Sequence, residues 1–142
     1  MKVELKSVKT CKWASDETTC FNAVIYIDGK REGTVENDGH GGCNFYFFTD
    51  RKVEEAFKAF AKAETGADFE PEDVYIGKLL DQYETEKQLR RWCKKETAFR
   101  LKGDKPEQWR TLKSPYSPTS VQFVRSKYGD QVEEILNERF AA

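Results

Sequence analysis

An Asp-Gly pair between two strand-like runs is the feature that most constrains the fold of this chain. From Phe21 to Ile27, residues of one parity are apolar, which is the period of a strand with one buried face. Asp28 and Gly29 follow, and a second strand-like run covers residues 31–35. Both central positions of a two-residue hairpin turn need a positive φ, which Gly adopts freely and Asp tolerates. The sequence therefore predicts a tight β-hairpin here.

The rest of the chain groups its strands and helices in blocks. We expect a strand over residues 2–13 and a final helix from Asp130, whose spacing to Glu133 matches a capping box. Strands and helices in separate blocks indicate an α+β fold, with an antiparallel N-terminal sheet covered by two helices, then a second hairpin and two C-terminal helices. The length is typical of a single domain over residues 1–142. Residues 1–49 are expected to be mainly strand and residues 50–96 helical. Residues 97–113 are expected to form the second hairpin and residues 117–141 to be helical.

Composition excludes several classes of protein. With 24 Lys and Arg against 25 Asp and Glu, the net charge is −1, so the chain is neither a strongly basic nucleic-acid binder nor an acidic DNA mimic. No run approaches the ~20 apolar residues that span a bilayer, and the N-terminus lacks the apolar core of a signal peptide. We therefore expect a cytoplasmic protein with no membrane partner, whose four cysteines are reduced thiols.

A glycine-rich loop is the first candidate binding site. Its glycines allow successive backbone N–H groups to point inward, as in an anion-binding nest, while His40 and Asp38 add polar side chains. A structural turn is the competing interpretation, because glycine clusters mark turns more often than sites. A third interpretation is a small enzyme that uses Asp38 and His40, the only histidine. The loop consists of Asn37, Asp38, Gly39, His40, Gly41 and Gly42.

Cysteine and histidine spacing gives little support to a metal site. His40 and Cys43 have the spacing of a small metal knuckle, and Cys11 and Cys20 can complete four zinc ligands if they lie on neighbouring strands. The chain has no Cys-x-x-Cys pair, which most zinc sites of this type contain. Cysteine is also common as a small buried apolar residue. We expect no metal and no cofactor.

A basic segment within a nearly neutral chain is the second candidate site. Residues 87–113 contain ten Lys or Arg and three Asp or Glu, a net charge of +7. Aromatic residues such as Trp92 and Trp109 lie among these cations, and rings with cations are how nucleotides and single strands are held. The competing interpretation is a charged, solvated face. Nucleic acid and an acidic protein surface are both compatible with this segment.

Three cations of the second hairpin are the strongest candidates within that segment. Arg100, Lys102 and Arg110 all occupy even positions, so we expect them on a common face of the hairpin. Such a cluster can bind phosphates or carboxylates, because each Arg offers two parallel donors.

The chain contains five runs, at residues 17–42, 97–104, 109–112, 127–130 and 135–138, that resemble small proteins encoded by bacteriophages and prophages. The resemblance implies an accessory protein that blocks a bacterial defence system, in the manner of anti-CRISPR proteins. We therefore expect a binding protein that occupies the surface of a host-defence protein in the host cytoplasm. The alternative is a small-ligand binder that sequesters a nucleotide signal.

Overall fold

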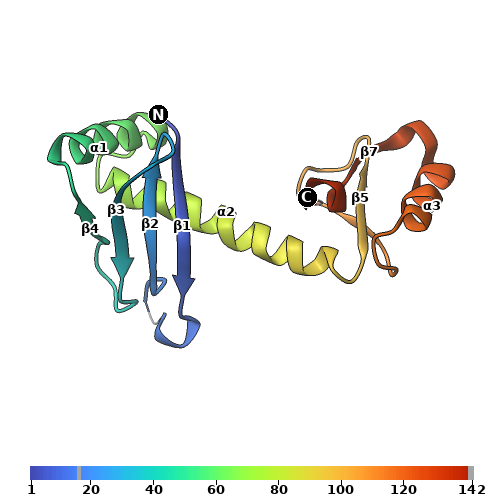
Figure 1. Ribbon diagram of the computed structural model, residues 1–142, viewed down its shortest axis with the longest axis horizontal. Coiled ribbons are helices and arrows are strands. Elements are labelled where there is room, and N and C mark those ends of the chain that lie inside the picture. The colour runs from blue at the N-terminus through green and yellow to red at the C-terminus, as the bar shows by residue number, and fades with distance from the viewer. Residues whose placement is uncertain (16, 141–142) are drawn as a thin grey trace. The chain divides into compact units, whose positions relative to one another are not determined.

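The computed structural model describes residues 1–15 and 17–140, and it has the predicted α+β fold (Figure 1). The chain divides into two compact units, Met1–Gln82 (unit 1) and Tyr83–Ala142 (unit 2), each with its own sheet. That the units unfold as a single cooperative domain stays a prediction. Among the described residues, no helix combines the length and apolar character that crossing a bilayer requires.

Unit 1 is built on four antiparallel strands that lie in chain order. The predicted tight turn joins the second and third strands, where Asp28 and Gly29 have φ of 51° and 83°. The strand predicted over residues 2–13 ends earlier, because the Ser15 hydroxyl bonds the Cys11 carbonyl and the chain turns in a 3-10 helix at Lys12–Ala14. The strands are β1 (Val3–Thr10), β2 (Phe21–Ile27), β3 (Lys30–Asn37) and β4 (Phe45–Phe48).

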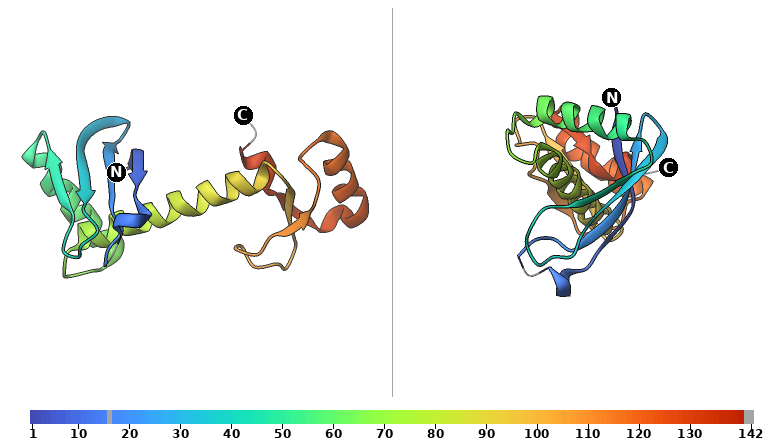
Figure 2. Two further views of the ribbon diagram at one scale, coloured as in Figure 1. Left: turned by 90° about the horizontal axis from the view of Figure 1, so that it is seen from below. Right: turned by 90° about the vertical axis from the view of Figure 1, so that its left-hand side faces the viewer.

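Two helices lie on one side of this sheet (Figure 2). Helix α1 spans Arg51–Thr65 and helix α2 spans Pro71–Cys93, both within the segment 50–96 that is predicted to be helical. Asp50 caps α1, since its carboxylate accepts a hydrogen bond from the Lys52 backbone N–H at 2.9 Å. Gly66 ends α1 in the left-handed conformation, with φ of 68°.

The core of unit 1 fills the space between sheet and helices, as predicted. Phe57 of α1 is fully buried, and Ile76 of α2 is buried in the same cluster, with Phe60 packed against it. The Phe57 ring centroid lies 5.7 Å from that of Phe48 and 6.1 Å from that of Tyr75. Alternate residues of β2 form the sheet side of this core: Phe21, Ala23, Ile25 and Ile27.

Unit 2 is organised around a second, smaller sheet in the order β6-β5-β7. The predicted second hairpin is formed by β5 and β6, which are antiparallel. Ser117 caps the next helix with a capping box to Ser120. Apolar residues of β5, α3 and β7 form its core. The elements are β5 (Thr97–Leu101), β6 (Arg110–Leu112), α3 (Pro118–Tyr128), a 3-10 turn (Gly129–Gln131), β7 (Val132–Ile135) and α4 (Leu136–Phe140).

The final helix predicted from Asp130 is wrong over its first half, because Val132–Ile135 forms strand β7. This strand pairs antiparallel with β5, and Ile135 lies opposite Phe99. Without β7, the second edge of β5 would leave backbone donors and acceptors unpaired. Pairing also buries Ile135, of which 2% is exposed. Long-range pairing and burial therefore outweigh the local helix signal, and only α4 remains helical.

Replacing Phe57 tests the core of unit 1. We expect Phe57→Ala to lower the free energy of unfolding by about 3–5 kcal/mol, because it removes a fully buried ring and leaves a cavity. Phe69→Ala is the matched control, since 79% of Phe69 is exposed and its loss should change stability little. Urea denaturation followed by circular dichroism measures both. Equal denaturation midpoints for Phe57→Ala and Phe69→Ala would show that α1 does not contribute to the core.

Candidate functional site

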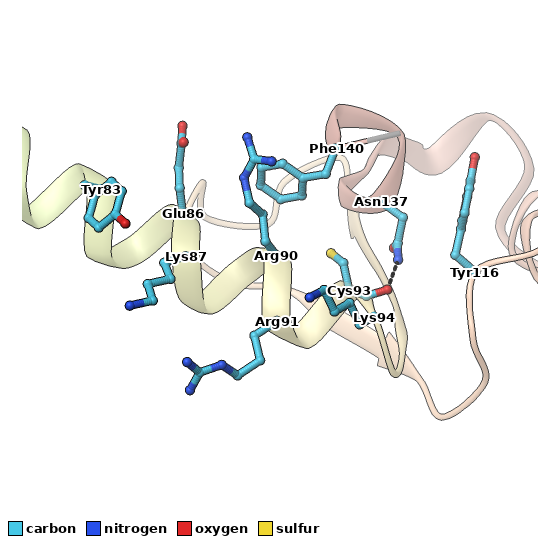
Figure 3. Close-up of a pocket in the computed structure, with 10 residues that line it drawn as sticks. All are labelled: Tyr83, Glu86, Lys87, Arg90, Arg91, Cys93, Lys94, Tyr116, Asn137 and Phe140. Carbon is cyan, nitrogen blue, oxygen red and sulfur yellow. Dashed lines mark hydrogen bonds between the residues drawn. The ribbon is translucent and has the colours of Figure 1, made fainter. Parts of the chain in front are cut away.

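A pocket of about 690 Å³ lies in unit 2 beside the C-terminal half of α2 (Figure 3). Its volume is within the range of pockets that hold small ligands or a partner's side chains. Residues from α2, from the segment before α3 and from α4 line it. They are Tyr83, Glu86, Lys87, Arg90, Arg91, Cys93, Lys94, Tyr116, Asn137 and Phe140.

Four exposed cations give this pocket its positive charge, three on α2 and Lys94 in the turn that directly follows the helix. Their spacing of three, four and seven residues places them along one side of the helix. The lining contains a single carboxylate, that of Glu86. Within the part of the chain that the structure describes, none of the four forms an ion pair with a carboxylate. We call Lys87, Arg90, Arg91 and Lys94 the basic stripe.

Aromatic rings form the apolar part of the pocket. The Arg90 guanidinium lies 4.7 Å from the centroid of the Phe140 ring, a cation–π contact that orients the charge without neutralising it. Tyr83 and Tyr116 contribute two further rings with hydroxyl groups. Cations and rings together can bind an acidic group that carries an apolar neighbour.

Asn137 holds the walls of the pocket together. Its side-chain amide donates to the carbonyl oxygens of Cys93 and Glu96 at 3.0 and 2.9 Å, and its Oδ1 accepts from the Ala98 N–H at 2.9 Å (Figure 3 shows the bond to Cys93). The last carbonyls of a helix have no partner within the helix. Asn137, of which only 3% is exposed, therefore fastens the end of α2 to the start of β5 and to α4.

The thiol of Cys93 also lines the pocket. Burial raises the pKa of this thiol, and the nearby Arg139 guanidinium only partly offsets that effect. The thiol is therefore protonated at neutral pH, and a protonated thiol is a poor nucleophile. The pocket thus offers charge and shape for binding rather than an activated cysteine.

Two of the three cations predicted on the hairpin are neutralised by ion pairs. Arg100 lies 3.6 Å from a carboxylate oxygen of Glu134, and 20% of its side chain is exposed. Arg110 donates two hydrogen bonds to Asp104, at 2.9 and 3.2 Å. Both charges are therefore paired with carboxylates within unit 2, whereas those of the basic stripe have no carboxylate partner among the described residues.

The hairpin cations also do not share a face. Arg110 lies directly opposite Phe99 in the β5–β6 register, and opposite residues of an antiparallel pair point to the same side of the sheet. Arg100 follows Phe99 in the strand and so points to the other side. Lys102 comes directly after β5 and is exposed. The common face expected from their even numbering is not formed.

The glycine-rich loop is closed by its own hydrogen bonds. The backbone N–H groups of Gly39 and His40 donate to the side chains of Asn37 and Asp38, at 2.9 and 3.1 Å. The Gly41 N–H lies 3.3 Å from the Thr18 hydroxyl. Three of the donors that a nest would direct at an anion are thus already bonded, which favours the structural turn over the binding loop. Gly42 is exposed, and its carbonyl lies 3.4 Å from the Asn37 amide.

The described residues contain no group of three or more His, Cys, Asp and Glu side chains that could hold a metal ion. Comparisons of the chain with family models, with curated proteins and with solved structures find no match. The basic pocket therefore carries the functional assignment. Sequence reasoning located the basic segment but missed the pocket, although the helical spacing of residues 87, 90, 91 and 94 was a usable signal.

Substitution of Gly39 tests the structural role of the loop. A Cβ atom at Gly39 would lie 2.1 Å from the Ala14 carbonyl oxygen, whereas one at Gly42 would meet nothing within 4 Å. Both residues have positive φ, which costs a non-glycine residue about 1–2 kcal/mol. We expect Gly39→Ala to be clearly more destabilising than Gly42→Ala in urea denaturation, because it adds a clash to the same backbone cost. Equal losses would mean that the loop simply moves away.

The ion pair of Asp104 predicts a pH effect. Hydrogen bonds from the Arg110 guanidinium and the Leu101 N–H hold the pKa of Asp104 at about 2. This pKa lies below that of Asp in the unfolded chain, about 3.9, so the pair contributes its full stabilisation of unit 2 at pH values above about 3.9. The stabilisation disappears as the pH falls through about 2. We expect Arg110→Gln to raise the Asp104 pKa in an NMR titration of its carboxyl carbon. An unchanged pKa would mean that the pair does not form in solution.

Proposed function

We propose that this chain is a binding protein whose basic pocket docks an acidic surface of a partner protein. The basic stripe carries this proposal. Four cations that have no carboxylate partner within the described residues stand along one side of a helix and border a pocket with three aromatic rings. Keeping like charges this close costs free energy, which an acidic partner would recover on binding.

The composition of the pocket supports a protein partner. Aromatic side chains and Arg are the residue types that contribute most to protein interfaces, especially around a central pocket. Tyr83, Tyr116 and Phe140 supply the rings, and Arg90 is already oriented by its contact with Phe140. Such a preorganised side chain loses less conformational entropy when it binds.

The charge balance of the chain also favours a compact acidic surface over a long nucleic acid. Unit 2 has 13 basic and 9 acidic residues, a net charge of +4, whereas unit 1 carries −5. The whole chain therefore has a net charge of −1 and no long-range attraction for a polyanion. A locally basic pocket matches a locally acidic partner.

The resemblance to small bacteriophage proteins points to a bacterial host-defence protein as the partner. In that setting, binding blocks the partner by occupying the surface it needs, and the site of action is the host cytoplasm. The chemistry of the pocket requires that this surface combine carboxylates with at least one apolar side chain.

A nucleotide is the second candidate ligand, and the volume of the pocket favours it. About 690 Å³ is enough for a nucleotide. Arg90, Arg91 and Lys94 would neutralise its phosphates, and the ring of Tyr116 or Tyr83 would stack on the base. This candidate places the sequestered signal in unit 2 rather than in the glycine-rich loop.

Charge reversal in the basic stripe tests the proposed function. We expect Arg90→Glu with Lys94→Glu to slow association with immobilised poly-L-glutamate by about tenfold or more at low salt, and by less at high salt, because exposed charges act mainly on the association rate and are screened. Lys52→Glu with Lys78→Glu, two exposed positions in unit 1, is the control of equal charge change. Surface plasmon resonance measures the rates.

Two further probes distinguish the candidates in the same experiment. If ATP binds to the parent but not to the stripe variant, and poly-L-glutamate does not bind, the result supports a nucleotide ligand and contradicts the protein partner. Association of the stripe variant as fast as the parent at low salt would contradict both. Binding of a single-stranded oligonucleotide more tightly than poly-L-glutamate would also contradict an acidic protein partner.

A further inference from the structure

Two cysteines of unit 1 lie directly opposite each other where β1 and β2 separate. Thr10 and Phe21 are the last pair of the β1–β2 ladder. One residue further, the Cys11 N–H donates to the Cys20 carbonyl oxygen at 3.0 Å, so the antiparallel register continues to these two residues. Both cysteines are free thiols of intermediate exposure.

The backbone geometry places the two thiols within reach of each other. Opposite residues in an antiparallel pair have Cα atoms about 4.5–5.5 Å apart, and disulfides span Cα separations of about 4.4–6.8 Å. Opposite side chains also point to the same face of a sheet. Cys11 and Cys20 also line one cavity of about 370 Å³ in unit 1, together with the two preceding pairs, Thr10–Phe21 and Lys9–Asn22.

The hydroxyl of Ser15 bridges the two backbones beside the thiols. It donates to the Cys11 carbonyl at 2.7 Å and accepts from the Cys20 N–H at 2.9 Å, so it takes the place of the second backbone bond of this pair. A disulfide needs Cβ atoms about 3.5–4.5 Å apart, roughly 1 Å closer than the usual cross-strand separation. A pair held by one direct bond at the end of a ladder can make that movement.

We propose that Cys11 and Cys20 are a reversible oxidation site that closes to an intramolecular disulfide. A peroxide oxidises one thiol to a sulfenic acid, its O–O bond breaks, and one water is released. The second thiolate then attacks the sulfenic sulfur, the S–S bond forms, and the hydroxyl leaves with a proton as a second water. A small-molecule thiol returns the pair to the reduced state by disulfide exchange.

The loop closed by this disulfide supports two other features of unit 1. Its first turn presents Trp13, of which 88% is exposed. Near its other end, the Glu17 and Thr18 N–H groups lie 3.0 and 3.4 Å from the Gly39 carbonyl oxygen of the glycine-rich loop. Oxidation therefore fixes the base of a loop that displays an exposed indole and backs the glycine-rich loop.

Thiol counting and peptide mapping test this site on the full chain. We expect treatment with hydrogen peroxide to lower the number of titratable thiols from four to two. Peptide mapping of the monomer should then find a disulfide between the peptides that contain Cys11 and Cys20. Cys43→Ser with Cys93→Ser should still lose both remaining thiols, and dithiothreitol should restore them. Cys20→Ser should form no intramolecular disulfide.

Different results would overturn the proposal. Four thiols remaining after peroxide treatment, or a disulfide through Cys43 or Cys93, would refute the pair. Limited trypsin cleavage after Lys12 tests the consequence, because a closed loop should be cut several times more slowly than the reduced one. An unchanged rate would show that the disulfide does not order the loop. The mapping of the parent decides the site even if Cys20→Ser fails to fold.

Discussion

The hydrogen bonds of Asn137 are the interaction on which unit 2 depends most. A helix that ends in the interior leaves carbonyl groups without partners, and these cost free energy unless something else satisfies them. One buried side-chain amide bonds the carbonyl of Cys93 at the end of α2, the carbonyl of Glu96 and the N–H of Ala98 in β5. It thereby fixes where α2 stops and how β5 leaves it. The basic pocket exists because α4, which carries Asn137 and Phe140, is held against that end of α2.

Ion pairing decides where positive charge is available. The basic segment is rich in Lys and Arg throughout, but its strands and its helix use them differently. In the sheet, Arg100 forms an ion pair with Glu134, and Arg110 forms one with Asp104. At the end of α2, the basic stripe has no carboxylate partner within the described residues, and the side chains beside it include three aromatic rings. The proposed binding function rests on the second arrangement and not on the net charge.

The two candidate sites of the sequence thus have different roles. The glycine-rich loop uses its donors internally and supports the end of the first sheet, where the loop from Cys11 to Cys20 packs against it. The basic segment provides the accessible charge. In the two proposals, unit 2 provides the surface for a partner, and the thiol pair of unit 1 provides a separate site of oxidation.

The sequence by itself determined the features that depend on neighbouring residues. Asp28-Gly29 predicted the turn, and the blocks of strands and helices predicted the α+β class. Only the tertiary structure decided that Val132–Ile135 is a strand, and which faces Arg100 and Arg110 occupy. Turns and caps are satisfied within a few residues, so their signals are local. Strand partners and ion pairs join residues far apart in the chain, and spacing within one segment does not identify those partners. For the pocket, such spacing indicates the basic stripe but not the residues of the other elements that line it.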